Sequence, residues 1–428
     1  MTREMARRTE VEVFFGGVDI TVPVRKNFLS LVYTDNENNE ADNLQLSLED
    51  RDGVWLTQYL DDNATSSTPA SDKNYKVIAQ SGLNVRSGPG ADSPRVGGFP
   101  YGAIVEVESI SSGWAKIRYG SSTAYVSAGY LEQAANVEVK PASIKGLNLQ
   151  ASIIRKNWYS DGARKVLDCG VFELDSIDAN GPPNIITIRG TSLPFQSQIR
   201  QTKKSKAWES YTLSSIANEI ASTNGMTCMY ESSSDPRYVR VEQIGKSDIA
   251  FLSQLCHEAG ISLKVTNNIL VLFDQEEYES KQEIVTITNG DGSYDSRKLR
   301  LGTAKAQYTS CRVRYIDPET GQLIQATATT TGKKYSGKSS QHLEIKAKVK
   351  DFREAKAMAE NALRNQNKQE RTAVFTMEGN PDLLAGVTVK LDGWGLWDGK
   401  YIISKAIHSV SGSGYTTQIR LRHTLEGY

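Results

Sequence analysis

The chain has 428 residues, which is too long for one compact core and suggests two to four domains. It carries 50 Lys and Arg against 50 Asp and Glu, and this balance argues against a sequence-specific nucleic-acid binder. The longest run of aliphatic and aromatic residues, Ile269 to Phe273, is far shorter than the roughly 20 residues that span a membrane. No basic segment followed by an apolar stretch opens the chain, so we expect a protein made in the bacterial cytoplasm without a signal peptide.

The neutral total hides an uneven distribution of charge. Residues 1–72 contain 14 acidic and 6 basic residues, a net charge of −8, whereas residues 281–371 contain 18 basic and 10 acidic residues, a net charge of +8. Opposed fields of this kind suit head-to-tail contact between copies of one chain. Solvated surfaces would explain the same pattern.

The first 60 residues alternate apolar and polar positions, as in Val11, Val13 and Phe15, which is typical of half-buried antiparallel strands. Residues 61–74 (DDNATSSTPASDKN) are small and polar and predict a flexible linker. A segment of about 60 residues follows, and then a second small-residue stretch at 133–135. The simplest topology is one β-domain interrupted by an inserted small domain.

This inserted segment resembles a bacterial SH3 domain. Three groups of residues carry the likeness: Leu83 to Gly90 (LNVRSGPG), Gly113 to Ile117 (GWAKI), and Ala124 to Ser127 (AYVS) with Tyr130-Leu131. Ser-Gly-Pro-Gly is a turn that redirects the chain, and Trp114 is large enough to anchor a small barrel core. Ala124 stands where the family usually has Gly.

Two interpretations of the insert's aromatic residues remain open. Bacterial SH3 domains often bind peptidoglycan, and exposed tyrosines would stack on its sugars or peptide; the candidates are Tyr101, Tyr119, Tyr125 and Tyr130. The other interpretation is that these rings complete the core of a small barrel and that the insert only decorates the protein.

Beyond the insert, strands are expected around Leu149 to Ile153, Cys169 to Asp175 and Asn184 to Ile188. Two helices follow, at 211–223 with Gly225 past its end, and after Ser247 with Gly260 as its stop. A hairpin across Asn267-Asn268 completes an α+β unit.

The last part of the chain returns to strands, around 284–287, 311–315, 373–377, 387–391, 401–406 and 416–421. One helix interrupts them, beginning at Asp351 with Glu354 as its capping partner. We therefore expect a β-rich α+β protein.

The sequence offers no catalytic, cofactor-binding or metal-binding signature. The phosphate-binding loop, dinucleotide fingerprint, zinc-protease and nucleophile-elbow motifs are all missing. The four cysteines are far apart in the sequence, and so are the four histidines. Glu276 and Glu277 are expected to be two solvent-exposed acids in a loop. We expect a protein that is not an enzyme and needs no cofactor.

Outside the insert, the sequence resembles the hub proteins of phage-type tail baseplates, the late-control D family. The match covers most of residues 10–60 and 140–428. Its parts are Asp42 to Asp50 with Trp55, Cys169 to Asp175, Gly181-Pro182-Pro183, Arg200 to Lys206 with Trp208-Glu209, Gln243 to Gly260 (QIGKSDIAFLSQLCHEAG), Asn380-Pro381, Gly386, and Gly399 to Tyr401. The run from 243 to 260 is the most specific.

The resemblance implies two β-barrel-like hub domains that flank the small α+β domain. We place the first hub domain at 1–61 and 135–205, the SH3-like insert at 74–134, the α+β domain at 206–280, and the second hub domain, with one helix, at 281–428. The resemblance also implies a homotrimer in which the two hub domains of each chain make a pseudo-sixfold ring.

The expected function is a symmetry adaptor that joins a sixfold tail tube to a threefold spike. Its partners would be the tail tube protein, the spike or tip protein and other baseplate proteins, with peptidoglycan as a further candidate ligand and no membrane. The host particle would be a phage, a tail-like bacteriocin or another contractile injection system. The alternatives are a cell-wall-binding adaptor outside any particle, or a peptidoglycan hydrolase or its accessory protein.

Overall fold

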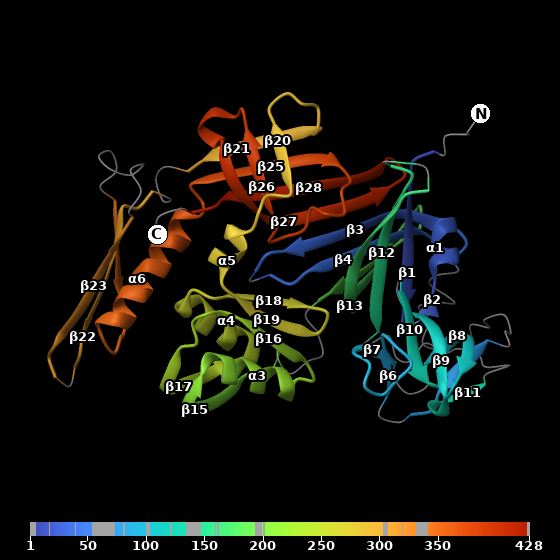
Figure 1. The fold of residues 1–428 in the computed structure, drawn as a ribbon, viewed down its shortest axis with the longest axis horizontal. Coiled ribbons are helices and arrows are strands. Elements are labelled where there is room, and N and C mark those ends of the chain that lie inside the picture. The colour runs from blue at the N-terminus through green and yellow to red at the C-terminus, as the bar shows by residue number, and fades with distance from the viewer. Residues whose placement is uncertain are drawn as a thin grey trace. The chain divides into compact units, whose positions relative to one another are not determined.

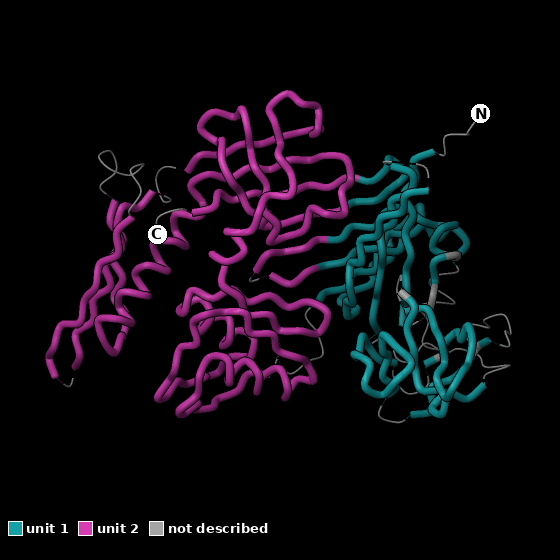
Figure 2. Tube along the Cα trace, in the orientation of Figure 1, with its two compact units in different colours: residues 1–33, 43–196, 409–415 teal, residues 34–42, 197–408, 416–428 magenta. Residues whose placement is uncertain are grey.

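The structure is a computed structural model, and its chain divides into two compact units (Figure 2). Unit 1 comprises residues 1–33, 43–196 and 409–415, and unit 2 comprises 34–42, 197–408 and 416–428. The described residues are 6–16, 18–38, 40–53, 73–79, 82–99, 103–119, 122–133, 147–158, 160, 162–192, 199, 202–302, 307–318, 320–330 and 341–425. The predicted linker at 61–74 lies almost wholly outside them, as do Trp55 and residues 134–146.

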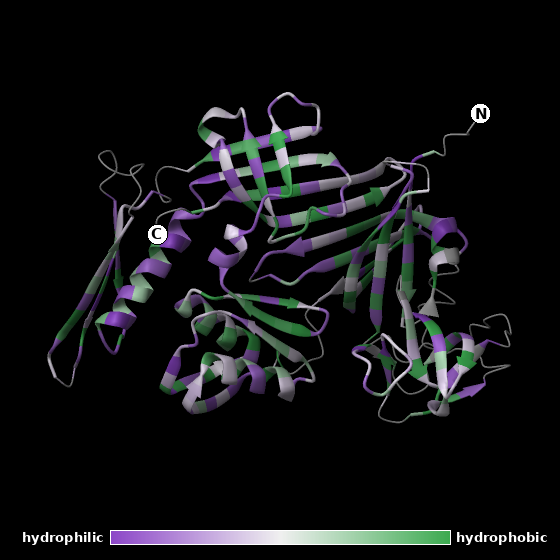
Figure 3. Ribbon diagram, in the orientation of Figure 1, coloured by the Kyte–Doolittle hydropathy of each residue, from purple (hydrophilic) through white to green (hydrophobic). Residues whose placement is uncertain are grey.

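Unit 1 contains an antiparallel sheet in the order β2-β1-β12-β13-β14-β4-β3 (Figure 1). Its elements are β1 (Arg8–Phe15), β2 (Val18–Asp19), α1 (Thr21–Asn27), β3 (Phe28–Asn36), β4 (Asn43–Glu49), β12 (Asn148–Lys156), β13 (Arg164–Asn180) and β14 (Ile185–Thr191). The predicted alternation is confirmed, because Val13, Leu46 and Ile153 are fully buried. Hydrophobic and hydrophilic residues accordingly alternate along the strands (Figure 3).

The inserted segment folds as a small β-structure in the same unit. Its elements are β5 (Asn74–Val77), β6 (Leu83–Arg86), β7 (Arg95–Phe99), β8 (Ile104–Ser111), β9 (Trp114–Tyr119), β10 (Ser122–Ser127), the 3-10 turn η2 (Ala128–Tyr130) and β11 (Leu131–Gln133). The strand order is β11-β5-β8-β9-β10-β6-β7. Trp114 is only half-buried and lies outside the core, so its predicted role as the core anchor is wrong; Phe99 is the aromatic ring of that core.

The first part of unit 2 is a compact α+β region. Its elements are β15 (Lys204–Thr212), α3 (Leu213–Thr223), β16 (Thr227–Glu231), β17 (Arg237–Lys246), α4 (Asp248–Ala259), β18 (Ser262–Thr266), β19 (Ile269–Phe273) and α5 (Gln275–Ser280). Strand β16 pairs in parallel with β19, and β15 pairs with β17. The hairpin across Asn267-Asn268 is confirmed, and both asparagines adopt the positive φ that such a tight turn requires.

Three details of this region differ from expectation. The first helix begins at Leu213 rather than at Tyr211, because Thr212 is its N-cap and forms a capping box with Ser215. Ser247 occupies the N-cap position of α4 without a side-chain capping bond. The Glu276-Glu277 pair lies in helix α5 rather than in a loop, although both side chains are exposed.

The second part of unit 2 contains a sheet in the order β21-β25-β28-β27-β26-β20. Its strands are β20 (Val285–Thr288), β21 (Ser296–Leu301), β25 (Arg371–Glu378), β26 (Thr388–Asp392), β27 (Gly399–Ser411) and β28 (Gly414–His423). A separate sheet of β22 (Ser310–Ile316), β23 (Leu323–Thr329) and β24 (His342–Lys346) is covered by α6 (Phe352–Asn367). Asp351 caps α6 and accepts a hydrogen bond from the Glu354 backbone, as predicted.

The β-rich α+β class is confirmed. Strand pairing among the described residues closes no barrel in either hub region, since β20 and β21 remain edge strands of the unit 2 sheet. No described helix combines the length and the apolar character needed to cross a membrane. The four-domain division with its boundaries stays a prediction.

Candidate functional site

The first candidate site is the surface of the SH3-like insert. Tyr119, at the end of β9, belongs to its packing: the ring lies edge-on to Phe99, with centroids 5.6 Å apart. A Cβ atom added to Gly97 would lie 2.6 Å from Tyr119 Cζ, so the ring rests directly on that glycine. Its hydroxyl accepts a hydrogen bond of 3.4 Å from Gln150 Nε2 on β12. Tyr119 therefore packs in the insert through its ring and contacts the hub sheet through its hydroxyl.

The other three tyrosines differ in their availability. Tyr130, in turn η2, is 53% exposed. Tyr125 on β10 is half-buried and lies opposite Lys116 and Arg86 on the neighbouring strands. Tyr101 lies outside the described residues. The structure thus leaves Tyr130 as the described candidate with the most open ring.

Charged residues surround these rings on the insert. Lys116 forms an ion pair of 2.8 Å with Glu108, and its hydrogen bond lowers the pKa of the Glu108 carboxyl. Both side chains are exposed, so the pair contributes little to stability.

The described part of the chain contains no group of three or more His, Cys, Asp or Glu side chains that could hold a metal ion. His408 is buried between Leu383 O, at 3.1 Å from its Nε2, and the Thr417 hydroxyl, and burial lowers its pKa to about 4. Burial likewise raises the pKa of Cys256 to about 12, which disfavours a reactive thiolate. Both side chains are buried in the packing of unit 2.

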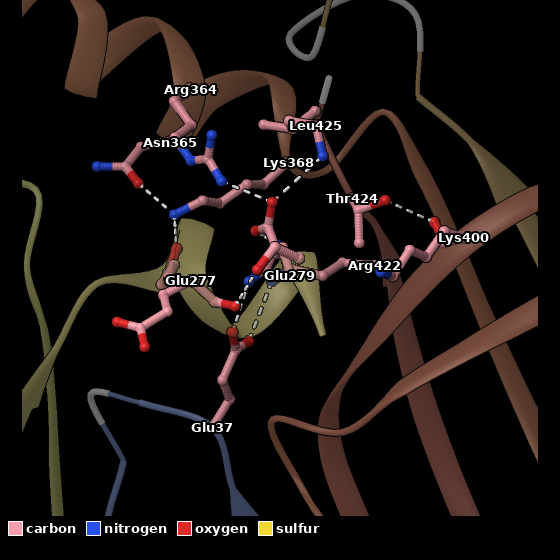
Figure 4. Close-up of polar contacts among 12 residues, drawn as sticks. Glu37, Glu277, Glu279, Arg364, Asn365, Lys368, Lys400, Arg422, Thr424 and Leu425 are labelled. Atoms are coloured by element: carbon pink, nitrogen blue, oxygen red, sulfur yellow. Dashed lines mark hydrogen bonds and ion pairs between the residues drawn. The ribbon is translucent and has the colours of Figure 1, made fainter. Parts of the chain in front are cut away.

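The second candidate site is a buried charge cluster in unit 2 (Figure 4). Arg422, on β28, donates from Nε to Glu37 at 3.0 Å and from Nη1 to Glu279 at 2.5 Å. Arg364 of α6 donates to the other oxygen of Glu279 at 2.6 Å. Lys368, just after α6, donates to Asn365 at 2.7 Å and also to Gln275.

The electrostatics of this cluster are dominated by burial. Desolvation alone would lower the pKa of Arg422, but the adjacent Glu37 and Glu279 raise it above its ordinary value. Burial would raise the pKa of Glu279, yet Arg422 and Arg364 hold it below the usual range. For Lys368, burial together with the two neighbouring arginines lowers the pKa to about 7. With two carboxylates and two guanidiniums, the cluster is therefore balanced when Lys368 is neutral and carries one excess positive charge when Lys368 is protonated.

A similar arrangement joins residues 34–42 to the α+β region. Lys264 of β18 pairs with Asp35 and, at 3.6 Å, with Asp42. Asp35 also accepts from the backbone of Ala385 at 2.8 Å, and Asp42 from that of Asn36 at 2.8 Å. Burial raises the pKa of Asp42 to about 7. Sequence analysis missed both clusters, because their members lie far apart in the chain.

These contacts show how several carboxylates of the acidic N-terminal segment are paired. Many of its carboxylates are neutralised by cations of the same chain: Glu10 by Arg25 and Lys156, Glu12 by Arg118, Asp35 and Asp42 by Lys264, Glu37 by Arg422, and Glu40 by Lys405. Asp35, Glu37 and Asp42 are also buried. These three carboxylates are therefore not exposed to a second copy, and charge pairing between copies stays a prediction.

The model of the phage tail baseplate hub (GPD) family matches residues 134–414, and that of the bacterial SH3 domain matches residues 81–132. The first match spans more than half of the chain, so the protein belongs to the phage tail baseplate hub family. In the structure, the SH3 domain is inserted within the hub fold, between strands β4 and β12.

Individual relatives agree with this assignment. The probable baseplate hub protein of Escherichia phage 186 is 22% identical over 305 residues, which cover 62% of this chain and 77% of that protein. The 43 kDa tail protein of prophage MuSo2 from Shewanella oneidensis has a similar fold, with a TM-score of 0.57, 12% identity, and 97% and 98% of the two chains covered. A probable endopeptidase p60 of Listeria welshimeri is 42% identical over 84 residues, which are 18% of this chain and 16% of that protein.

Proposed function

We propose that three copies of this chain form the hub ring of a phage tail or phage-tail-like particle and join a sixfold tail tube to a threefold spike. The observation that carries this proposal is the family match over residues 134–414. Strands β1–β4 with β12–β14 in unit 1, and strands β20, β21 and β25–β28 in unit 2, give each chain two candidate ring segments. Three chains would then present six segments to the tube, while the chain-level threefold symmetry meets the spike.

Light scattering coupled to size exclusion tests the assembly, and negative-stain images test its shape. We expect a mass of three chains of 47.2 kDa each and rings with a central hole. A variant that lacks residues 74–134 is the matched control, because the ring should form without the insert. A monodisperse monomer at all concentrations, in both proteins, would overturn the proposal.

A second function, contact of the insert with the bacterial cell wall, is supported by the SH3 match and by the exposed ring of Tyr130. Aromatic rings stack on the apolar faces of sugars and on peptide groups. Sedimentation with purified peptidoglycan, with and without residues 74–134, tests this contact. Wall binding by a protein that stays monomeric would favour the alternative, an adaptor that acts outside a particle.

We propose further that the protein is not an enzyme and is carried into the assembled particle as a structural component. A zymogram on embedded peptidoglycan separates this role from that of a hydrolase. Clearing of the gel by the intact chain, and its loss on deletion of 74–134, would instead indicate a wall-cutting activity that depends on the insert.

A further inference from the structure

The SH3-like insert and the first hub sheet meet through a small set of polar contacts within unit 1. Arg118 Nη2, on β9 of the insert, lies 2.6 Å from Glu12 Oε1 on β1. The neighbouring residue, Tyr119, accepts from Gln150 on β12. Two consecutive residues of the insert therefore contact two adjacent strands of the sheet.

The hub side of this contact is built on one face of the sheet. In the β1–β12 register Glu12 pairs with Ser152 and Phe14 pairs with Gln150, and alternation places these four side chains on the same face. Phe14 and Ser152 are buried, and Glu12 is only 12% exposed. A carboxylate so far removed from water needs a cation close by.

Arg118 supplies that cation. The nearest other cation to Glu12, Arg164, lies 4.0 Å from the same oxygen, and Glu12 Oε2 is buried without a hydrogen-bond partner among the described residues. Removing Arg118 would leave the Glu12 charge poorly compensated. The contact is thus more than the meeting of two solvated side chains.

We infer that the insert docks on the β1–β12 face of its own chain and does not move freely on its linkers. The Arg118–Glu12 ion pair stabilises the docked position. In the docked position the hydroxyl of Tyr119 is occupied by Gln150, whereas Tyr130 remains exposed. Docking therefore determines which aromatic residues of the insert a ligand can reach. This inference does not rest on the proposed hub or wall-binding function.

Distances between two spin labels test the docking in the full-length protein. The labels are placed on exposed residues, through Asp92→Cys in the insert and Asn180→Cys in the hub sheet, with the half-buried Cys228 changed to Ser. Labelled chains are diluted into unlabelled chains, so that distances within one chain dominate. We expect one narrow distance distribution.

The role of the Arg118–Glu12 ion pair is tested with Glu12→Gln, Arg118→Gln and the double variant. Glu12→Gln should lower the ratio of docked to undocked insert about three- to fivefold. Arg118→Gln should lower it more, because it leaves the Glu12 carboxylate without its cation, and the double variant should behave like Glu12→Gln. Lys116→Gln, which breaks the Lys116–Glu108 pair inside the insert, is the matched control and should leave the distribution unchanged. A broad distribution in the unmodified chain, or additive effects of the two changes, would overturn the inference.

Discussion

Arg422 on the last strand donates hydrogen bonds to both carboxylate oxygens of Glu37, a residue 385 positions earlier in the chain. The same guanidinium also binds Glu279 at the end of helix α5. One side chain thus joins three distant segments of unit 2. Because all three groups are buried, each replaces its contacts with water by hydrogen bonds to the others.

Replacing Arg422 by Met should strongly destabilise unit 2, because two buried carboxylates lose their main cation. We expect a loss of about 3–5 kcal/mol in the free energy of unfolding. Urea denaturation monitored by hydrogen exchange of unit 2 peptides measures it. Arg420→Met, an exposed position on the same strand, is the control, and an equal loss in both variants would contradict the proposed role.

Lys368 should make the stability of unit 2 depend on pH. Its pKa is about 7 in the folded protein and about 10.4 in an unfolded chain, so between these values the unfolded state binds more protons. Stability should therefore rise with pH from 7 to 10 by at most about 1.4 kcal/mol per pH unit from this group. The pKa of the neighbouring Glu279 is lowered and that of Arg422 is raised, so both shifts lead away from that range.

Urea denaturation at several pH values, in Lys368→Met and in the unmodified chain, measures this dependence. The variant should lack the rise between pH 7 and 10. Lys356→Met, at an exposed position of the preceding helix α6, should retain it. Parallel pH profiles for the unmodified chain and Lys368→Met would show that Lys368 is charged throughout.

Asp42 should have the opposite dependence. Burial raises its pKa to about 7 against about 3.9 in an unfolded chain, so the folded state binds the extra proton between pH 4 and 7. Its contribution to stability is thus greatest near pH 4 and falls as the pH rises to 7. Asp42→Asn should be more stable than the unmodified chain at pH 8 and little changed at pH 4, by urea denaturation. Asp35→Asn, whose carboxylate binds Lys264 and the Ala385 amide, should lose stability at pH 8.

Gly97→Ala should loosen the insert, because the added Cβ would lie 2.2 Å from the Tyr119 hydroxyl oxygen and 2.6 Å from Cζ. The ring must move, at a cost of about 1–3 kcal/mol. Hydrogen exchange of peptides from residues 81–132 in the full chain measures the change. Gly129→Ala has no atom within 4 Å of the new Cβ and should exchange like the unmodified chain. Equal protection in both variants would mean that Tyr119 adapts freely.

The sequence by itself determined the local elements and the family. Period-two alternation located the buried positions of β1 and β4, turn residues located the 267–268 hairpin, and Asp351 with Glu354 located the start of α6. Such features depend on neighbours in the chain, which is why they can be read from it. The order of the SH3 and hub motifs identified both domains.

Only the tertiary structure decided which charges meet. Nothing in the composition shows that Glu37 and Arg422, or Asp42 and Lys264, are partners, because ion pairing depends on distance in space and these residues are more than 200 positions apart. The structure also separated Tyr119, which packs on Gly97, from Tyr130, which is exposed. The zero net charge follows from the composition alone, but only the fold brings acids of the first segment against bases of the later ones.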